Sequence, residues 1–168
     1  MADDYARLLE EQIPALRRYA FALVRDHDAA DDLVQDSLER ALSRRYLRHP
    51  EGDLRAWLFT ILRNLYISAY RTRKRRDVWK TIDEAQSSIE PEQEAGLQAR
   101  DVLTAIDQLP EEQKSLLLLI SVEDLSYEQA AQVLAIPVGT VMSRLFRARQ
   151  RLRTIMENGC APLLRRVK

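Results

Sequence analysis

The sequence predicts an all-α protein with two small helical domains joined by a flexible linker, the second containing a helix-turn-helix. Three observations favour this fold class. The 168 residues are 46% hydrophobic and include only four glycines and six prolines, which is typical of a helix-rich chain. Apolar residues recur at spacings of three and four in both halves, and no sheet is obvious. An acidic segment containing Pro91 and Gly96 separates the two halves.

The first domain is predicted over residues 1–76 and begins with two helices. Pro14 suits a first helical turn, and the first helix should end near Asp26. Its apolar stripe is Leu16, Tyr19, Ala20, Leu23 and Val24. The next helix, within 26–47, has an apolar stripe of Ala30, Leu33, Val34, Leu38, Ala41 and Leu42. Its other stripe is unusually acidic and consists of Asp28, Asp32, Gln35, Asp36 and Glu39.

A loop is expected over residues 48–53, where Pro50 and Gly52 interrupt the helical pattern. Asp53 is a suitable N-cap for the helix that follows. The core stripe of that helix is Trp57, Leu58, Ile61, Leu62 and Leu65. The helix then runs into the basic sequence YRTRKRR at 70–76.

The net charge is zero, but the charges are distributed in blocks. Residues 54–76 hold seven bases and no acid, residues 77–112 hold ten acids and two bases, and residues 138–168 hold eight bases and one acid. Two basic stretches divided by an acidic one indicate two nucleic-acid contacts joined by a segment that phosphate repels. Residues 77–98 are accordingly predicted to be an acidic linker.

The second domain is predicted over residues 99–168. An apolar helix is expected from about Glu111 to Val122, after Pro110. Ser126 then has the spacing of a capping box and opens a short helix whose buried side is Ala130, Ala131, Val133 and Leu134. After a tight turn, Gly139 and Thr140 open a second helix. Val141, Leu145, Ala148 and Leu152 should face inward, and Ser143, Arg144, Arg147 and Arg151 outward. This arrangement predicts a helix-turn-helix whose second helix enters the major groove.

The first basic stretch suits a single strand because aromatic and amide side chains are interleaved with its cations. Bases stack on aromatic faces, an amide reads a base edge, and cations follow the backbone. The side chains concerned are Phe59, Asn64, Tyr66, Tyr70 and Trp79. For each aromatic taken singly, packing within the domain is the favoured interpretation.

Other classes of function find no support in the sequence. There is no pairing of a nucleophile with a base and no glycine-rich phosphate loop, so no enzyme is predicted. His27, His49 and Cys160 are too scattered for a metal site, and no cofactor is expected. No apolar run is long enough to cross a bilayer, and the N-terminus lacks the features of a signal peptide. A cytoplasmic protein is therefore expected.

Five motifs together resemble the sigma-70 family, specifically its extracytoplasmic-function group. They are DLVQD at 32–36, RAWLFTILRN at 55–64, LPEEQ at 109–113, LSYEQAA at 125–131 and PVGTVMSRLFRARQRL at 137–152. The resemblance implies an alternative sigma factor that binds core RNA polymerase and directs transcription initiation at specific promoters. The implied partners are the beta-prime clamp and beta flap of the polymerase, promoter DNA and an anti-sigma factor.

The resemblance also implies a role for individual positions. The polymerase-docking face would be Asp32, Gln35, Asp36 and Glu39. The minus-ten element would be captured by the loop 48–53, including His49 and Gly52, by Asn64, and by Arg71, Arg73, Lys74, Arg75 and Arg76. The minus-thirty-five element would be bound by Thr140, Ser143, Arg144, Arg147, Arg149 and Arg151, with Arg144 or Arg147 reading a guanine edge. Met142 stands where many relatives have Lys or Arg, and its presence is expected to cost a phosphate contact.

Two alternatives from other classes of function remain open. A sigma-like decoy would titrate an anti-sigma factor without needing DNA contacts, and the retained arginines argue against it. An autonomous helix-turn-helix regulator would bind duplex DNA without polymerase. Gel shifts with and without core enzyme distinguish these alternatives from a sigma factor.

Overall fold

The computed structural model describes residues 2–77 and 94–158, and describes side chains for residues 4–73 and 100–158. The described ranges contain helices joined by loops and no strand, which confirms the all-α prediction. The first domain contains α1 (Ala2–Val24), α2 (His27–Ser43), the short 3-10 helix η1 (Arg45–Leu47) and α3 (Leu54–Asp77). The second contains α4 (Glu94–Asp107), α5 (Glu111–Ser121), α6 (Tyr127–Leu134) and α7 (Val138–Glu157).

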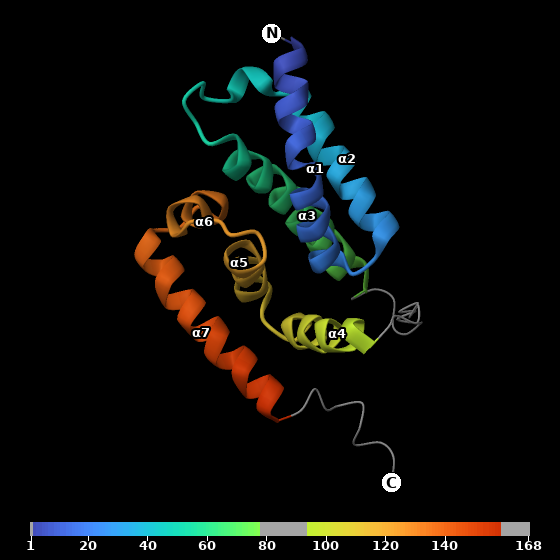
Figure 1. The fold of residues 1–168 in the computed structure, drawn as a ribbon, viewed down its shortest axis with the longest axis vertical. Helices are drawn as coiled ribbons and strands as arrows, with labels where there is room; N and C mark the ends of the chain where they lie inside the picture. The colour runs from blue at the N-terminus through green and yellow to red at the C-terminus, as the bar shows by residue number, and fades with distance from the viewer. Residues whose placement is uncertain (1, 78–93, 159–168) are drawn as a thin grey trace.

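Helices α1, α2 and α3 pack side by side around an apolar core (Figure 1). Leu16 and Tyr19 of α1 and Phe59 and Leu62 of α3 are fully buried. The rings of Tyr19 and Phe59 meet edge to face with their centroids 5.2 Å apart, a preferred geometry for an aromatic pair. Leu58 and Leu62 of the predicted α3 stripe lie in this core, whereas Trp57, Ile61 and Leu65 are only partly buried.

Helix α1 is longer than the sequence predicts, because Pro14 lies inside it rather than in its first turn. A proline inside a helix lacks the N–H that would bond the preceding turn. The residues before it nevertheless stay helical because they pack on the domain. Leu9 is buried, and the Tyr5 hydroxyl contacts the Ala41 carbonyl oxygen of α2 at 3.4 Å. This packing offsets the lost backbone bond.

The buried line of α2 differs from prediction, since Leu42 is 49% exposed, Leu33 and Leu38 are only partly buried, and Ser37 is buried instead. The line consists of Ala30, Val34, Ser37 and Ala41. Successive helical residues are rotated by about 100°. Because Ala41 points into the core, the next residue, Leu42, points away from it. Ser37 can be buried because its hydroxyl donates to the Leu33 carbonyl oxygen at 2.7 Å.

The helix-turn-helix forms as predicted from α6 and α7. The Ser126 hydroxyl accepts from the Gln129 N–H at 3.0 Å, and the Gln129 side chain accepts from the Ser126 N–H at 2.8 Å, completing the capping box. Ala135 has a φ of 53° at the end of α6, and α7 starts three residues later. Val141, Leu145 and Ala148 of α7 are buried as expected.

The segment predicted as the linker, 77–98, mostly lies outside the described residues, which resume at residue 94. Helix α3 reaches Asp77, and α4 begins at Glu94, five residues before the expected start of the second domain. None of the helices in 2–77 and 94–158 is long and apolar enough to span a bilayer.

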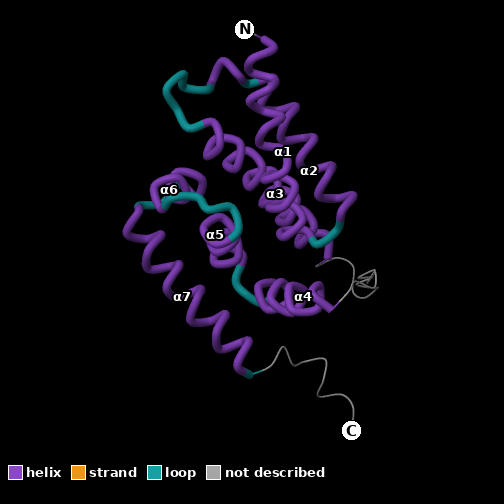
Figure 2. Tube along the Cα trace, in the orientation of Figure 1, coloured by secondary structure: helices purple, strands orange, loops and turns teal. Residues whose placement is uncertain are grey.

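The two domains dock against each other and share one apolar core. Helix α3 packs against α6, and α1 packs against α5. In Figure 2 the loop between α5 and α6 runs along this boundary, beside α3. The contact joins segments that lie far apart in the sequence.

Candidate nucleic-acid interface

The acidic face of α2 is exposed as predicted. Asp32, Gln35, Asp36 and Glu39 all reach solvent on the side opposite the buried line. The Gln35 amide donates to the Glu39 carboxylate at 3.2 Å, which leaves the aspartates open to a partner. Leu42, which the helical pattern predicts in the core, is exposed and borders this face. An apolar side chain beside carboxylates suits a protein partner better than nucleic acid, because carboxylates repel phosphate.

The loop 48–53 is held in a tight turn at its centre and anchored at its ends. The Gly52 N–H donates to the His49 carbonyl oxygen at 2.9 Å. A Cβ at Gly52 would lie 3.1 Å from that oxygen, so this turn favours glycine. Arg48 lies over the ring of Tyr5 at 5.9 Å, whereas His49 is exposed. The loop therefore presents His49 on a fixed backbone.

The end of the loop is fixed by Asp53, which caps α3 as predicted. Its carboxylate accepts from the Ala56 N–H at 3.1 Å. It also accepts from the Gln129 side chain of α6, so the loop is tied to the second domain. Burial on its own would raise the pKa of Asp53, but these bonds and the Arg55 N–H outweigh it and lower the pKa overall.

Helix α3 exposes Asn64, Arg71 and Arg73. The side chains of Lys74, Arg75 and Arg76 lie outside the described residues, as does Trp79. Phe59 and Tyr66 are buried, so these two aromatic side chains pack within the domain. This agrees with the sequence-based expectation for each aromatic residue taken singly. Burial raises the pKa of the Tyr66 hydroxyl, and the Glu111 carboxylate raises it further, so the group stays protonated. Tyr70 is more exposed and lies near the ring of Tyr66.

The residues predicted to bind the minus-thirty-five element are all on α7 but differ in their surroundings. Ser143, Arg147, Arg149 and Arg151 are exposed, and Thr140 is half-buried. The Ser143 hydroxyl donates to the Thr140 carbonyl oxygen at 3.1 Å. Arg144 does not point freely outward as predicted, because it pairs with Glu112 of α5 at 3.4 Å and is only 30% exposed. Arg147 is thus the more available of the two candidate readers.

Two apolar side chains on α7 were not among the predicted site residues. Met142 and Phe146 are each more than half exposed, one helical turn apart. The signal that could have revealed them is their position, since they interrupt an otherwise polar outer face. An exposed phenylalanine on a recognition helix can contact the methyl group of thymine.

Comparisons with known proteins agree with this layout. A model of the family described as sigma-70, region 4 matches residues 99–152, and a model of the Sigma2 domain of PhyR matches residues 9–63. The ECF RNA polymerase sigma factor EcfG of Rhodopseudomonas palustris is 40% identical over 150 residues, covering 86% of this chain and 80% of that protein. The chain belongs to the extracytoplasmic-function sigma factors of the sigma-70 family.

Further relatives of this sigma factor show the same correspondence across both domains. The ECF sigma factor SigL of Mycobacterium tuberculosis is 36% identical over 162 residues, covering 90% of this chain and 89% of that protein. The structure is similar to the sigma factor RpoE of Bartonella quintana, solved in complex with the anti-sigma factor NepR, with a TM-score of 0.80 and 37% identity. That likeness covers 92% of this chain and 97% of the other.

Proposed function

We propose that this sigma factor binds core RNA polymerase and directs it to initiate transcription at specific promoters. The observation that carries the proposal is that one chain exposes an acidic protein-facing surface on α2 together with basic surfaces on α3 and α7. A repressor does not need the first of these, and a decoy does not need the other two. The 40% identity to EcfG across 150 residues supports the same conclusion.

The acidic face of α2 is the proposed docking surface for the beta-prime clamp of the polymerase. Asp32, Asp36 and Glu39 supply charge complementarity, and Leu42 adds an apolar contact at the edge. Complementary charge raises the rate and specificity of association, and a like charge placed opposite costs several kcal/mol. The beta flap is the proposed partner of the second domain.

The minus-ten element is the proposed ligand of the loop 48–53 and α3. His49 and Gly52 would border an unpaired base, and the Asn64 amide would hydrogen-bond its edge. Arg71 and Arg73, followed in sequence by Lys74, Arg75 and Arg76, would hold the adjacent phosphates. Cations along the backbone and one amide at a base match the general pattern of single-strand recognition.

The minus-thirty-five element is the proposed ligand of α7. Arg147 would read a guanine edge, since Arg binds the O6 and N7 atoms of guanine bidentately. Phe146 would contact a thymine methyl group. Arg149 and Arg151, with Thr140 and Ser143, would contact the backbone or adjacent bases. Arg144 would contribute mainly by fixing α7 on α5 through Glu112.

An anti-sigma factor is a further proposed partner, because the similar sigma factor RpoE of Bartonella quintana was solved in complex with the anti-sigma factor NepR. We also propose that the chain catalyses no reaction of its own and works in the cytoplasm, where its polymerase and DNA partners reside.

Transcription in vitro with purified core polymerase and a promoter library tests the proposal directly. A sigma factor gives transcripts from a defined subset of promoters only when both chain and core are present. A decoy gives none at any promoter but relieves inhibition of another sigma factor by its anti-sigma factor. An autonomous regulator binds a specific duplex tightly in a gel shift at physiological salt without core enzyme.

A further inference from the structure

The short helix η1 lies in a basic, exposed segment that has no role in the sites described above. Residues 40–49 hold four arginines and no acid. Arg40 lies in the last turn of α2, where a cation stabilises the helix dipole. Arg44 and Arg45 follow it and are exposed. The side chain of Tyr46 is 78% exposed, and no residue of η1 is buried. Packing therefore does not account for the arginines and the aromatic ring at this position.

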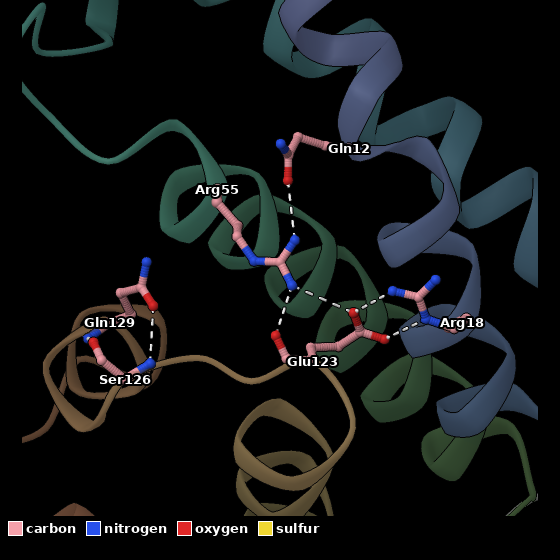
Figure 3. A network of polar contacts seen from close by, with 6 residues as sticks. All are labelled: Gln12, Arg18, Arg55, Glu123, Ser126 and Gln129. Atoms are coloured by element: carbon pink, nitrogen blue, oxygen red, sulfur yellow. Dashed lines mark hydrogen bonds and ion pairs between the residues drawn. The ribbon is translucent and has the colours of Figure 1, made fainter.

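The arginines beside η1 differ from those that hold the fold together. Arg18 of α1 and Arg55 of α3 both reach the buried carboxylate of Glu123, as Figure 3 shows. Within the described part of the chain, no carboxylate pairs with Arg44 or Arg45. A guanidinium without a carboxylate partner keeps its N–H donors for another anion, and phosphate fits their geometry. Arg44 and Arg45 are therefore available to bind a phosphate group.

The backbone that carries these side chains is fixed. The Leu47 N–H donates to the Arg44 carbonyl oxygen at 2.8 Å, and the Arg48 N–H donates to the Arg45 carbonyl oxygen at 3.2 Å. The Arg48 guanidinium lies over the Tyr5 ring of α1. Burial raises the pKa of the Tyr5 hydroxyl, and Arg48 and Arg45 oppose this increase, which places both cations near that residue. A surface formed in advance loses little freedom when it binds a partner.

This surface continues directly into the loop 48–53, the proposed site for the unpaired base. Arg48 ends η1 and begins that loop. Figure 1 shows η1 meeting one end of the loop and α3 leading away from the other end. The exposed Asn64, Arg71 and Arg73 lie along α3. The loop therefore lies between two sets of cations, and only the set on α3 has been given a ligand above.

Single-stranded DNA is the partner whose chemistry fits residues 44–46. Cations follow the backbone of a single strand, and an aromatic ring stacks on a base whose face is free. Duplex DNA would contact the arginines but would offer no free base face to Tyr46. A polymerase surface that complements the acidic face of α2 has the wrong charge for Arg44 and Arg45. An unpaired strand is therefore favoured over both alternatives.

We propose that Tyr46 is a second base-stacking site, separate from the loop 48–53, and that Arg44 and Arg45 hold the phosphates beside the stacked base. The inference rests on the sigma-factor function proposed above, because promoter opening supplies the unpaired strand. One base enters the loop, and a base on the η1 side of it stacks on Tyr46. Stacking depends little on base identity, so this site adds affinity for the open strand rather than sequence preference.

Binding of single-stranded DNA to the holoenzyme tests the stacking. The probe is a fluorescent oligonucleotide with the non-template strand of a promoter selected in the library transcription, spanning its minus-ten element. Tyr46→Ala should weaken binding about fivefold or more. Tyr46→Phe keeps the aromatic ring and should bind as the parent does. Val122→Ala, an exposed apolar change in the second domain, is the control and should have no effect.

The salt dependence of the same binding tests the phosphate contacts. Loss of one cation contact to a single strand makes the slope of log K against log salt concentration shallower by about 0.7. We expect this change in Arg45→Gln. Arg17→Gln removes an exposed arginine that pairs with Asp31 inside the first domain, and it should keep the slope of the parent.

Competition for core polymerase separates a DNA contact from a protein contact. Tyr46→Ala should compete for core as well as the parent does. The inference is overturned if Tyr46→Ala loses core binding to the same degree as strand binding, if it binds the strand as the parent does, or if Arg45→Gln keeps the parent slope. Absence of both strand binding and transcription with the parent holoenzyme would instead remove the sigma-factor function, and this inference with it.

Discussion

Neighbouring arginines on one helix can have different roles when only one of them has a protein partner. Arg144 and Arg147 are one turn apart on α7, yet Arg144 pairs with Glu112 and Arg147 is exposed. A guanidinium already held by a carboxylate must break that contact before it can read a base. We therefore expect the two residues to differ in their effect on specificity.

Arg147→Ala should cost about 1 to 3 kcal/mol of promoter binding and relax preference at one position of the minus-thirty-five element. Arg144→Ala should leave the preferred sequence unchanged. Selection from a library randomised across that element, performed with holoenzyme carrying each variant, measures both effects. Arg153→Ala, an exposed change farther along α7, is the control. The assignment fails if Arg144→Ala alters the selected sequence and Arg147→Ala does not.

Asn64 is exposed on the helix that also exposes Arg71 and Arg73, a position from which its amide can reach an unpaired base. We expect Asn64→Ala to impair promoter opening more than initial binding to the closed duplex, because the base edge is available only after unpairing. Permanganate footprinting measures opening, and a gel shift measures binding. Ser68→Ala, one turn along α3 and also exposed, is the matched control. Equal opening by Asn64→Ala and the parent would contradict the role.

The two opposite faces of helix α2 have different compositions. Small residues on one side pack against α1 and α3, and four polar residues on the other side reach solvent. Charge on the outer face can therefore be changed without loss of core contacts. This separation makes the helix suitable for a direct test of polymerase docking.

Asp36→Lys should weaken binding to core polymerase by about tenfold or more, which corresponds to about 1.4 kcal/mol. The reason is that the lysine would face the polymerase surface proposed to complement the acidic face of α2. Helix content measured by circular dichroism should not change. Competition for core enzyme against a second sigma factor provides the measurement. Glu10→Lys makes the same charge change at an exposed site on α1 and should have little effect. Equal competition by Asp36→Lys and Glu10→Lys would remove α2 from the interface.

Docking of the two domains should respond to acid, because several of the contacts between them use carboxylates. Asp53 shows the direction in which docking should change with pH. Its pKa is lowered in the folded chain, chiefly by the bond from Gln129 once the opposing effect of burial is overcome. A carboxyl with a lowered pKa stabilises the docked state above its ordinary pKa, and this stabilisation is lost as the pH falls through the lowered value.

Dyes attached through Glu11→Cys on α1 and Gln132→Cys on α6, both exposed positions, in a Cys160→Ser background, report the docking of the domains by energy transfer. We therefore expect this energy transfer to decrease in acid, below the ordinary carboxyl range. In Asp53→Asn, the contribution of Asp53 to the decrease of energy transfer in acid should disappear. Docking should also be weaker at neutral pH, because one acceptor for Gln129 is lost. A titration of energy transfer against pH compares the two chains. Identical titration curves would show that Asp53 does not contribute to docking.

The sequence by itself determined the helices, their caps and the faces that carry charge. Periodicity and capping depend on residues three or four apart, so the capping box at Ser126 and the N-cap at Asp53 could be recognised locally. The exposed positions of Asn64, Arg147 and the acidic residues of α2 follow from the same short-range pattern. The family resemblance, which adds a role to each position, also depends on contiguous motifs.

The tertiary structure decided which of these residues have distant partners. Glu123 and Arg18 are 105 residues apart in the chain, and nothing in their local spacing indicates that they meet. The same reason accounts for the pairing of Arg144 with Glu112, for the helical residues before Pro14, and for the exposure of Leu42. A helical pattern specifies a face, but the neighbouring helices determine how wide the buried part of that face is and which charges are enclosed when the domains dock.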